Sequence, residues 1–86
     1  MMRARVVVTL KREVLDPQGE AVRRGLRSLG VEGVGEVRVG RVIDIELDDA
    51  TADPEGLLRD AARRLLANGV IEDFHVELPR PATNAT

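Results

Sequence analysis

Cysteine, tryptophan and tyrosine are absent from this 86-residue chain, and Phe74, His75, Ser28 and Lys11 are each the only residue of their type. The lack of cysteine excludes disulfides, thiolate nucleophiles and cysteine-ligated zinc. One imidazole among scattered carboxylates lacks the ligand spacing of a metal site, and one serine with one histidine does not make a nucleophile, a base and an orienting group. We therefore predict no catalytic, cofactor-binding or metal-binding residue in this chain.

The chain also lacks a large excess of charge of either sign. Thirteen basic and 15 acidic residues give a net charge of −2, and the two signs alternate along the chain instead of forming blocks. This composition argues against a nucleic-acid surface, and the near absence of aromatic residues argues against base stacking. No N-terminal apolar segment is typical of a signal peptide or a membrane span, so we expect a cytoplasmic protein without nucleic-acid or membrane partners.

A short motif occurs twice, as Asp-Pro-Gln-Gly at 16–19 and Asp-Pro-Glu-Gly at 53–56. In each copy the aspartate can cap a helix, and the proline suits the first helical position because it has no N–H to leave unpaired. Apolar residues then recur at helical spacing, which predicts helices at about 17–29 and 54–67. The spacing also predicts three exposed ion pairs, namely Glu20 with Arg24, Glu55 with Arg59 and Asp60 with Arg64.

Alternating apolar and polar residues predict strands at 3–10, within 34–47, and at 70–78. The middle stretch is interrupted at Gly40. A hairpin there would need an odd-length loop or a bulge to keep Val39 and Ile43 on one face. Alternatively, one long bent strand passes through Gly40, and part of it could pair with another subunit.

The order strand-helix-strand, repeated, predicts an α+β fold of the ferredoxin-like type, with four antiparallel strands and both helices on one face. We assign residues 1–79 to this single domain and 80–86 to a flexible C-terminal tail. On the open face, arginines of the first strand are expected between acidic residues of its neighbours. Because so small a domain is marginally stable alone, self-association to a dimer or tetramer is expected.

Four ordered segments resemble the PurS family, the small subunit of phosphoribosylformylglycinamidine synthase. They are Leu15-Asp16-Pro17-Gln18-Gly19, Val37-Arg38-Val39-Gly40-Arg41, Leu65-Leu66-Ala67-Asn68 and Val70-Ile71-Glu72-Asp73-Phe74. The resemblance spans residues 3–78. Two positions depart mildly from the family pattern, where Arg41 stands in place of a common lysine and Phe74 in place of a common tyrosine.

The resemblance implies a non-catalytic subunit of a ligase complex in purine biosynthesis. In that complex a PurQ-type glutaminase subunit releases ammonia from glutamine, and a large PurL-type synthetase subunit uses it with ATP and Mg to form the amidine of formylglycinamide ribonucleotide. The small subunit is expected to join the two and to assist ammonia transfer, so the isolated chain is expected to be inactive. An ACT-like regulatory domain, which binds small metabolites, is the alternative that the duplicated strand-helix-strand pattern leaves open.

The polar residues of the matching segments are the predicted partner interface, since core packing does not require them. They are Asp16, Pro17, Gln18, Gly19, Arg38, Gly40, Arg41, Asn68, Glu72 and Asp73. Helix capping and turn formation are the competing explanation for several of these positions.

Overall fold

The computed structural model describes residues 1–79 of the chain. Its elements are β1 (Met2–Leu10), α1 (Pro17–Ser28), β2 (Gly40–Leu47), α2 (Pro54–Ala61), a π-helical turn η1 (Ala62–Leu66) and β3 (Glu72–Glu77). The predicted α+β class and both predicted helices are therefore confirmed. The predicted flexible tail, 80–86, lies outside the described residues. No helix in 1–79 is long and apolar enough to cross a membrane.

The sheet has three strands in the described part of the chain, in the order β2-β1-β3, and both neighbouring pairs are antiparallel. The register places Arg5 of the central strand opposite Asp44 on one side and Glu77 on the other. The Arg5 Nε lies 3.0 Å from a carboxylate oxygen of Asp44. The predicted alternation of basic and acidic residues across the open face is thus present.

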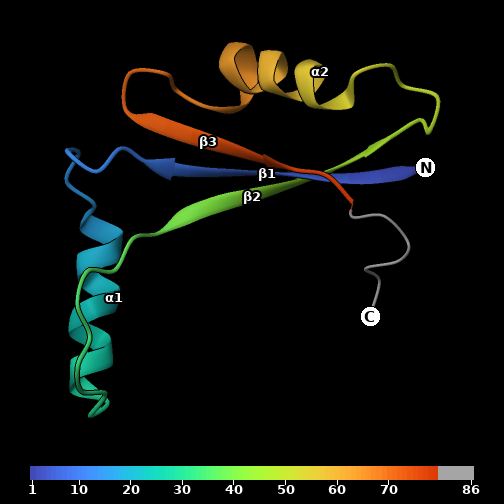
Figure 1. The fold of residues 1–86 in the computed structure, drawn as a ribbon. Helices are drawn as coiled ribbons and strands as arrows, with labels where there is room; N and C mark the ends of the chain where they lie inside the picture. The colour runs from blue at the N-terminus through green and yellow to red at the C-terminus, as the bar shows by residue number, and fades with distance from the viewer. Residues whose placement is uncertain (80–86) are drawn as a thin grey trace.

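The other face of the sheet carries the core, because every second residue of β1 points to the same side. Val6 and Val8 are almost completely buried there and cluster with Ala62 of η1, and Leu58 of α2 is also buried. Figure 1 shows α2 lying along this face of the sheet. A single helix with its π-helical turn therefore makes the core with the three strands.

The position of the core predicts that a valine-to-alanine substitution changes the free energy of unfolding by different amounts on the two faces of the sheet. Val6→Ala removes buried methyl groups and is expected to lower the free energy of unfolding by about 2 kcal/mol. Val42→Ala, on the open face, where the native side chain is 54% exposed, is expected to cost less than about 0.5 kcal/mol. Urea denaturation of both variants measures the difference, and equal losses would contradict the assignment of the core face.

The position of α1 differs from the prediction. Figure 1 shows α1 projecting away from the end of the sheet, beside the return segment 31–39, rather than covering the face that α2 covers. The Cα radius of gyration is 16.4 Å, whereas a compact chain of this length has about 12 Å. We call α1 with residues 29–39 the arm. The arm carries exposed apolar side chains, among them Leu29, 81% exposed, and Val22, 44% exposed.

The fourth strand of the predicted ferredoxin-like sheet is not present in the described residues. β2 begins only at Gly40, and residues 34–38 make no backbone-to-backbone hydrogen bond with the rest of 1–79. The Val39 N–H could have donated to a carbonyl oxygen of a neighbouring strand. It donates to the Asp16 carboxylate instead. The chain passes through Gly40 without a hairpin, as in the bent-strand alternative, but its first half is unpaired.

The predicted ion pairs are formed in one case out of three. Asp60 and Arg64 are paired at 3.3 Å, as expected. Glu20 pairs with Arg23 at 3.4 Å instead of with Arg24, a spacing that a helix permits equally. No ion pair between Glu55 and Arg59 occurs in the described chain, and Arg59 instead lines a pocket beside β3.

Candidate functional site

Asp16 holds the base of the arm together. Its side chain caps α1, where one carboxylate oxygen accepts from the Gly19 N–H at 2.9 Å. The second oxygen accepts from the Val39 N–H at 2.8 Å. The residue is only 6% exposed. One carboxylate therefore connects the start of α1 to the end of the return segment, which fixes both ends of the arm at the edge of the sheet.

Arg38 holds the loop between β1 and α1 from the other side. Its Nη2 donates to the carbonyl oxygens of Lys11 at 2.7 Å and Val14 at 3.0 Å, with a longer contact to that of Leu10 at 3.5 Å. A planar guanidinium suits such a role because its donors are fixed in direction. The Arg38 charge also favours the ionised form of Asp16 nearby. Together these two side chains define how the arm leaves the sheet.

Gly19 is required by the same contact between helix and return segment. A Cβ atom built at this position would overlap the carbonyl oxygen of Val37 and lie 2.9 Å from the Asp16 carboxylate. Only the absence of a side chain lets the first turn of α1 approach the return segment this closely. The second glycine of the predicted interface, Gly40, has the same constraint, because a Cβ there would overlap the Val8 carbonyl oxygen.

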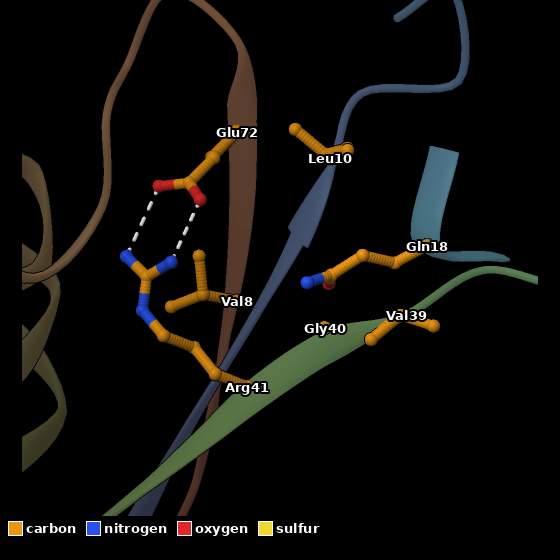
Figure 2. A pocket seen from close by; sticks show the side chains of 7 residues that line it. All are labelled: Val8, Leu10, Gln18, Val39, Gly40, Arg41 and Glu72. Atoms are coloured by element: carbon orange, nitrogen blue, oxygen red, sulfur yellow. Dashed lines mark hydrogen bonds and ion pairs between the residues drawn. The ribbon is translucent and has the colours of Figure 1, made fainter. Parts of the chain in front are cut away.

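An open pocket of about 310 Å³ lies where the arm meets the sheet. Figure 2 shows the side chains that line it, which come from β1, α1, β2 and β3 and include Gln18, Arg41 and Glu72. Arg41 and Glu72 form a bidentate ion pair, with N–O distances of 2.8 and 3.1 Å. The Arg41 guanidinium also donates to the Leu66 carbonyl oxygen. This arginine thereby connects β2 to β3 and to the end of η1.

Glu72 is the acceptor at the centre of that arrangement. Besides Arg41, it accepts from the Asn68 N–H at 2.7 Å. The hydrogen bond from Arg41, followed by that from the Asn68 backbone, lowers the pKa of the Glu72 carboxyl, while partial burial acts in the opposite direction. The same pairing raises the pKa of Arg41. The pair is therefore ionised on both sides at neutral pH.

Most of the residues predicted as a partner interface converge at this corner of the molecule. Asp16, Gly19 and Arg38 build the base of the arm, Gln18, Gly40, Arg41 and Glu72 line the pocket, and Asn68 donates to Glu72. Pro17 is exposed in the first turn of α1. Asp73 lies one residue beyond Glu72 and pairs with Lys11 at 2.9 Å. We call this set the arm–sheet corner.

Sequence reasoning missed two parts of the corner. Lys11 pairs with Asp73 across the end of the sheet, and the pairing raises the pKa of the Lys11 amine. This pair depends on the β1–β3 register, which places Thr9 opposite Asp73 and which the sequence does not specify. The three carbonyl oxygens around Arg38 had no signal in the sequence, because backbone acceptors in a loop follow no residue pattern.

The arrangement offers structural contacts and no assembled reaction centre. His75 stands exposed on β3, 3.2 Å from Glu77, while Ser28 is the last residue of α1 on the arm. Within 1–79 there is no group of three or more histidine, cysteine or acidic side chains that could hold a metal ion. What the corner supplies is a fixed angle between two bodies, the sheet with α2 and the arm.

The Asp16 contacts predict a defined dependence of stability on pH. Hydrogen bonds from the backbone N–H groups of Gly19 and Val39 lower the pKa of Asp16 below its ordinary value of 3.8. As pH falls, the unfolded chain therefore takes up this proton before the folded chain does, and protonation favours unfolding. The stabilisation from Asp16 is complete well above pH 3.8 and is lost as pH falls below it.

Asp16→Asn tests this prediction. The asparagine keeps one oxygen to cap α1, but its NH2 group, a donor, then faces the Val39 N–H, which is also a donor. We therefore expect a lower melting temperature at pH 7 and a flatter loss of stability below about pH 4. Asp60→Asn, on the exposed side of α2, serves as the control and should keep the acid profile of the native chain. Parallel profiles for the native chain and Asp16→Asn would contradict the role of this carboxylate.

Comparison with known proteins agrees with this architecture. The family model described as PurS, phosphoribosylformylglycinamidine (FGAM) synthase, matches residues 3–80. The phosphoribosylformylglycinamidine synthase subunit PurS of Mycobacterium leprae is 46% identical over 76 residues, which cover 88% of this chain and 94% of that protein.

Solved structures of PurS subunits have a similar backbone. The crystal structure of Methanocaldococcus jannaschii PurS superposes with a TM-score of 0.81 at 32% identity, covering 94% of this chain and 99% of that one. A chain in the structure of PurLQS from Thermotoga maritima superposes with a TM-score of 0.78 at 28% identity, covering 91% and 96%. The sequence match and the matching backbone lead to one conclusion: this chain belongs to the PurS family of phosphoribosylformylglycinamidine synthase subunits.

Proposed function

We propose that this chain is the small, non-catalytic subunit of the FGAM synthase complex in purine biosynthesis, where it joins the glutaminase and synthetase subunits. The observation that carries the proposal is the match to PurS over residues 3–80, together with the likeness to a chain of the PurLQS structure. In this role the complex, and not this chain, uses ATP, Mg and glutamine. Membership of the PurS family favours this role over an ACT-like regulatory domain.

The arm–sheet corner is the part of the molecule suited to such a role. A subunit that joins two others must hold two surfaces at a fixed angle, and here Asp16 and Arg38 fix the arm relative to the sheet. Ammonia that leaves one site for another is lost to solvent unless the two sites are aligned and closed, so rigidity at this corner favours its transfer. We assign the predicted interface residues of the corner to contacts with the two larger subunits, in a cytoplasmic complex.

Co-elution tests the assembly directly. The chain is mixed with the purified synthetase and glutaminase subunits in the presence of ATP, Mg and glutamine, and the mixture is passed over a size-exclusion column. We expect one peak that contains all three proteins and that does not form when this chain is omitted. A stable two-protein complex of the larger subunits, from which this chain is excluded, is the opposite result.

Self-association is the second contact that we propose, and the arm supports it. Leu29 of the arm is 81% exposed, Leu15 just before α1 is 80% exposed, and residues 34–38 of the arm present unpaired backbone groups. Extended segments of this kind add readily to the edge of another sheet. A second copy of this chain would cover the arm, and the return segment would then form the fourth strand of the ferredoxin-like pattern.

Leu29→Lys and Leu65→Lys separate the arm from the rest of the surface. Both leucines are 81% exposed, but Leu29 lies on the arm and Leu65 in η1. If the arm is the contact, Leu29→Lys weakens self-association by at least about tenfold, since burying a leucine contributes more than that factor, while Leu65→Lys leaves it unchanged. Sedimentation equilibrium measures both, and an equal effect of the two variants contradicts this assignment.

A further inference from the structure

A second pocket, separate from the arm, lies between the end of α2 and the start of β3. It has a volume of about 520 Å³ and is lined by Lys11, Arg59, Arg63 and Phe74, together with the carboxylates of Glu72 and Asp73. This volume falls within the usual range for small-molecule sites. Three cationic side chains and the only aromatic ring of the chain therefore meet in one hollow.

Both carboxylates of the pocket already have partners. Asp73 pairs with Lys11 at 2.9 Å, and Glu72 accepts two hydrogen bonds from the Arg41 guanidinium. In contrast, neither Arg59 nor Arg63 has a carboxylate within ion-pair distance among residues 1–79. After the internal pairs are formed, two guanidinium charges remain for a ligand.

The two arginines are placed together by the helix. They are four residues apart across the junction of α2 with η1, so they lie on the same side one turn apart, where like charges repel each other. Asp60, on the same helix, pairs with Arg64 instead. An anion bound between Arg59 and Arg63 would relieve this repulsion.

The Phe74 ring restricts the conformation of one of the two guanidinium groups, that of Arg63. The guanidinium carbon of Arg63 lies 5.9 Å from the centre of the Phe74 ring. Contact of a guanidinium with an aromatic face leaves the N–H donors at its edge free for a planar or tetrahedral oxyanion. Arg63 is therefore held in position before a ligand arrives, which lowers the conformational entropy that binding would cost.

From this geometry we propose that the pocket binds a small phosphate-bearing molecule, with the phosphate between Arg59 and Arg63. A phosphate monoester carries close to two negative charges at pH 7, which matches the two unpaired guanidinium groups. Its oxygens accept the paired donors of an arginine in the geometry that guanidinium groups favour. The remaining volume, beside Phe74, accommodates the organic part of the molecule. The proposal does not rest on the subunit role proposed above, but the pocket shares Glu72 and Asp73 with the arm–sheet corner.

Titration of the isotopically labelled full chain tests the site without any partner subunit. Inorganic phosphate and ribose 5-phosphate are added separately at constant ionic strength, and the amide resonances of Arg63, Gly69 and Phe74 are followed by NMR. We expect saturable shifts at these positions with both probes. Tighter binding of ribose 5-phosphate identifies an organic phosphate as the ligand, whereas equal binding identifies the phosphate group alone as what is recognised.

The double variant Arg59→Gln with Arg63→Gln is expected to weaken binding by at least about tenfold, because charge-assisted hydrogen bonds are lost. Arg24→Gln with Arg27→Gln removes the same charge from α1 and should bind as the native chain does. Equal weakening by both double variants would indicate general charge attraction and overturn the site. So would saturable binding of citrate that is tighter than that of either phosphate probe, or the absence of shifts with both phosphates.

Discussion

Gly19→Ala is expected to lower the free energy of unfolding by about 2 kcal/mol or more, although alanine is the better helix former. Gly19 lies in the first turn of α1, and a Cβ there would overlap the Val37 carbonyl oxygen, which belongs to the backbone and cannot rotate away. The new methyl group would also press against the Asp16 carboxylate. The substitution therefore separates the start of the arm from its return segment, and denaturant unfolding followed by circular dichroism measures the loss.

Gly25→Ala is the matched control for this prediction. It lies in the same helix, and nothing is found within 4 Å of the position its Cβ would take. Alanine should therefore stabilise the helix there, by about 0.5–1 kcal/mol. Opposite signs for the two variants support the close contact at the base of the arm. A stabilising Gly19→Ala would mean that the return segment does not lie against α1 in solution.

Arg41→Ala is expected to reduce glutamine-dependent FGAM formation by the complex at least about tenfold, a loss typical of an interface hot spot. Arg41 connects β2, β3 and η1 through its contacts with Glu72 and Leu66, and it lines the pocket at the arm–sheet corner. Without it, the Glu72 carboxylate loses its charged partner and the corner loses its fixed shape. Arg41→Lys keeps the charge and should retain more activity than Arg41→Ala.

Two further measurements test whether the effect is on the coupling of glutamine to synthesis and is specific to the corner. Ammonia-dependent FGAM formation by the same complex should change little, because the synthetase site is not touched. Arg24→Ala, an exposed arginine of α1 outside the corner, should leave both activities at the native level. If Arg41→Ala lowers the two activities equally, the residue does not act in coupling glutamine to synthesis.

The elements themselves were predictable from the sequence because the signals are local. Asp16 and Asp53 each cap the helix that follows through the N–H three residues on, as the repeated motif indicated. The alternation in β1 placed Val6 and Val8 on the buried face. Such features depend on neighbours along the chain, and the resemblance to PurS added the residues of the arm–sheet corner.

The direction of the arm was not predictable in this way. The apolar stripe of α1 indicates that the helix packs against something, but not that its partner lies outside the three-stranded sheet. What fixes the arm is a set of non-local contacts, from Asp16 to Val39 and from Arg38 to the carbonyl oxygens of the 11–14 loop. Residues 34–38 have the alternation of a strand, yet a strand needs a partner, and the described chain supplies none to them.

The most direct test of the subunit role is FGAM formation by the purified synthetase and glutaminase subunits, measured with and without this chain. Each mixture is supplied with either glutamine or ammonia, at the same ATP and Mg concentrations. We predict that glutamine-dependent turnover requires the chain and that ammonia-dependent turnover does not. Glutamine-dependent turnover at the full rate without the chain would contradict the account.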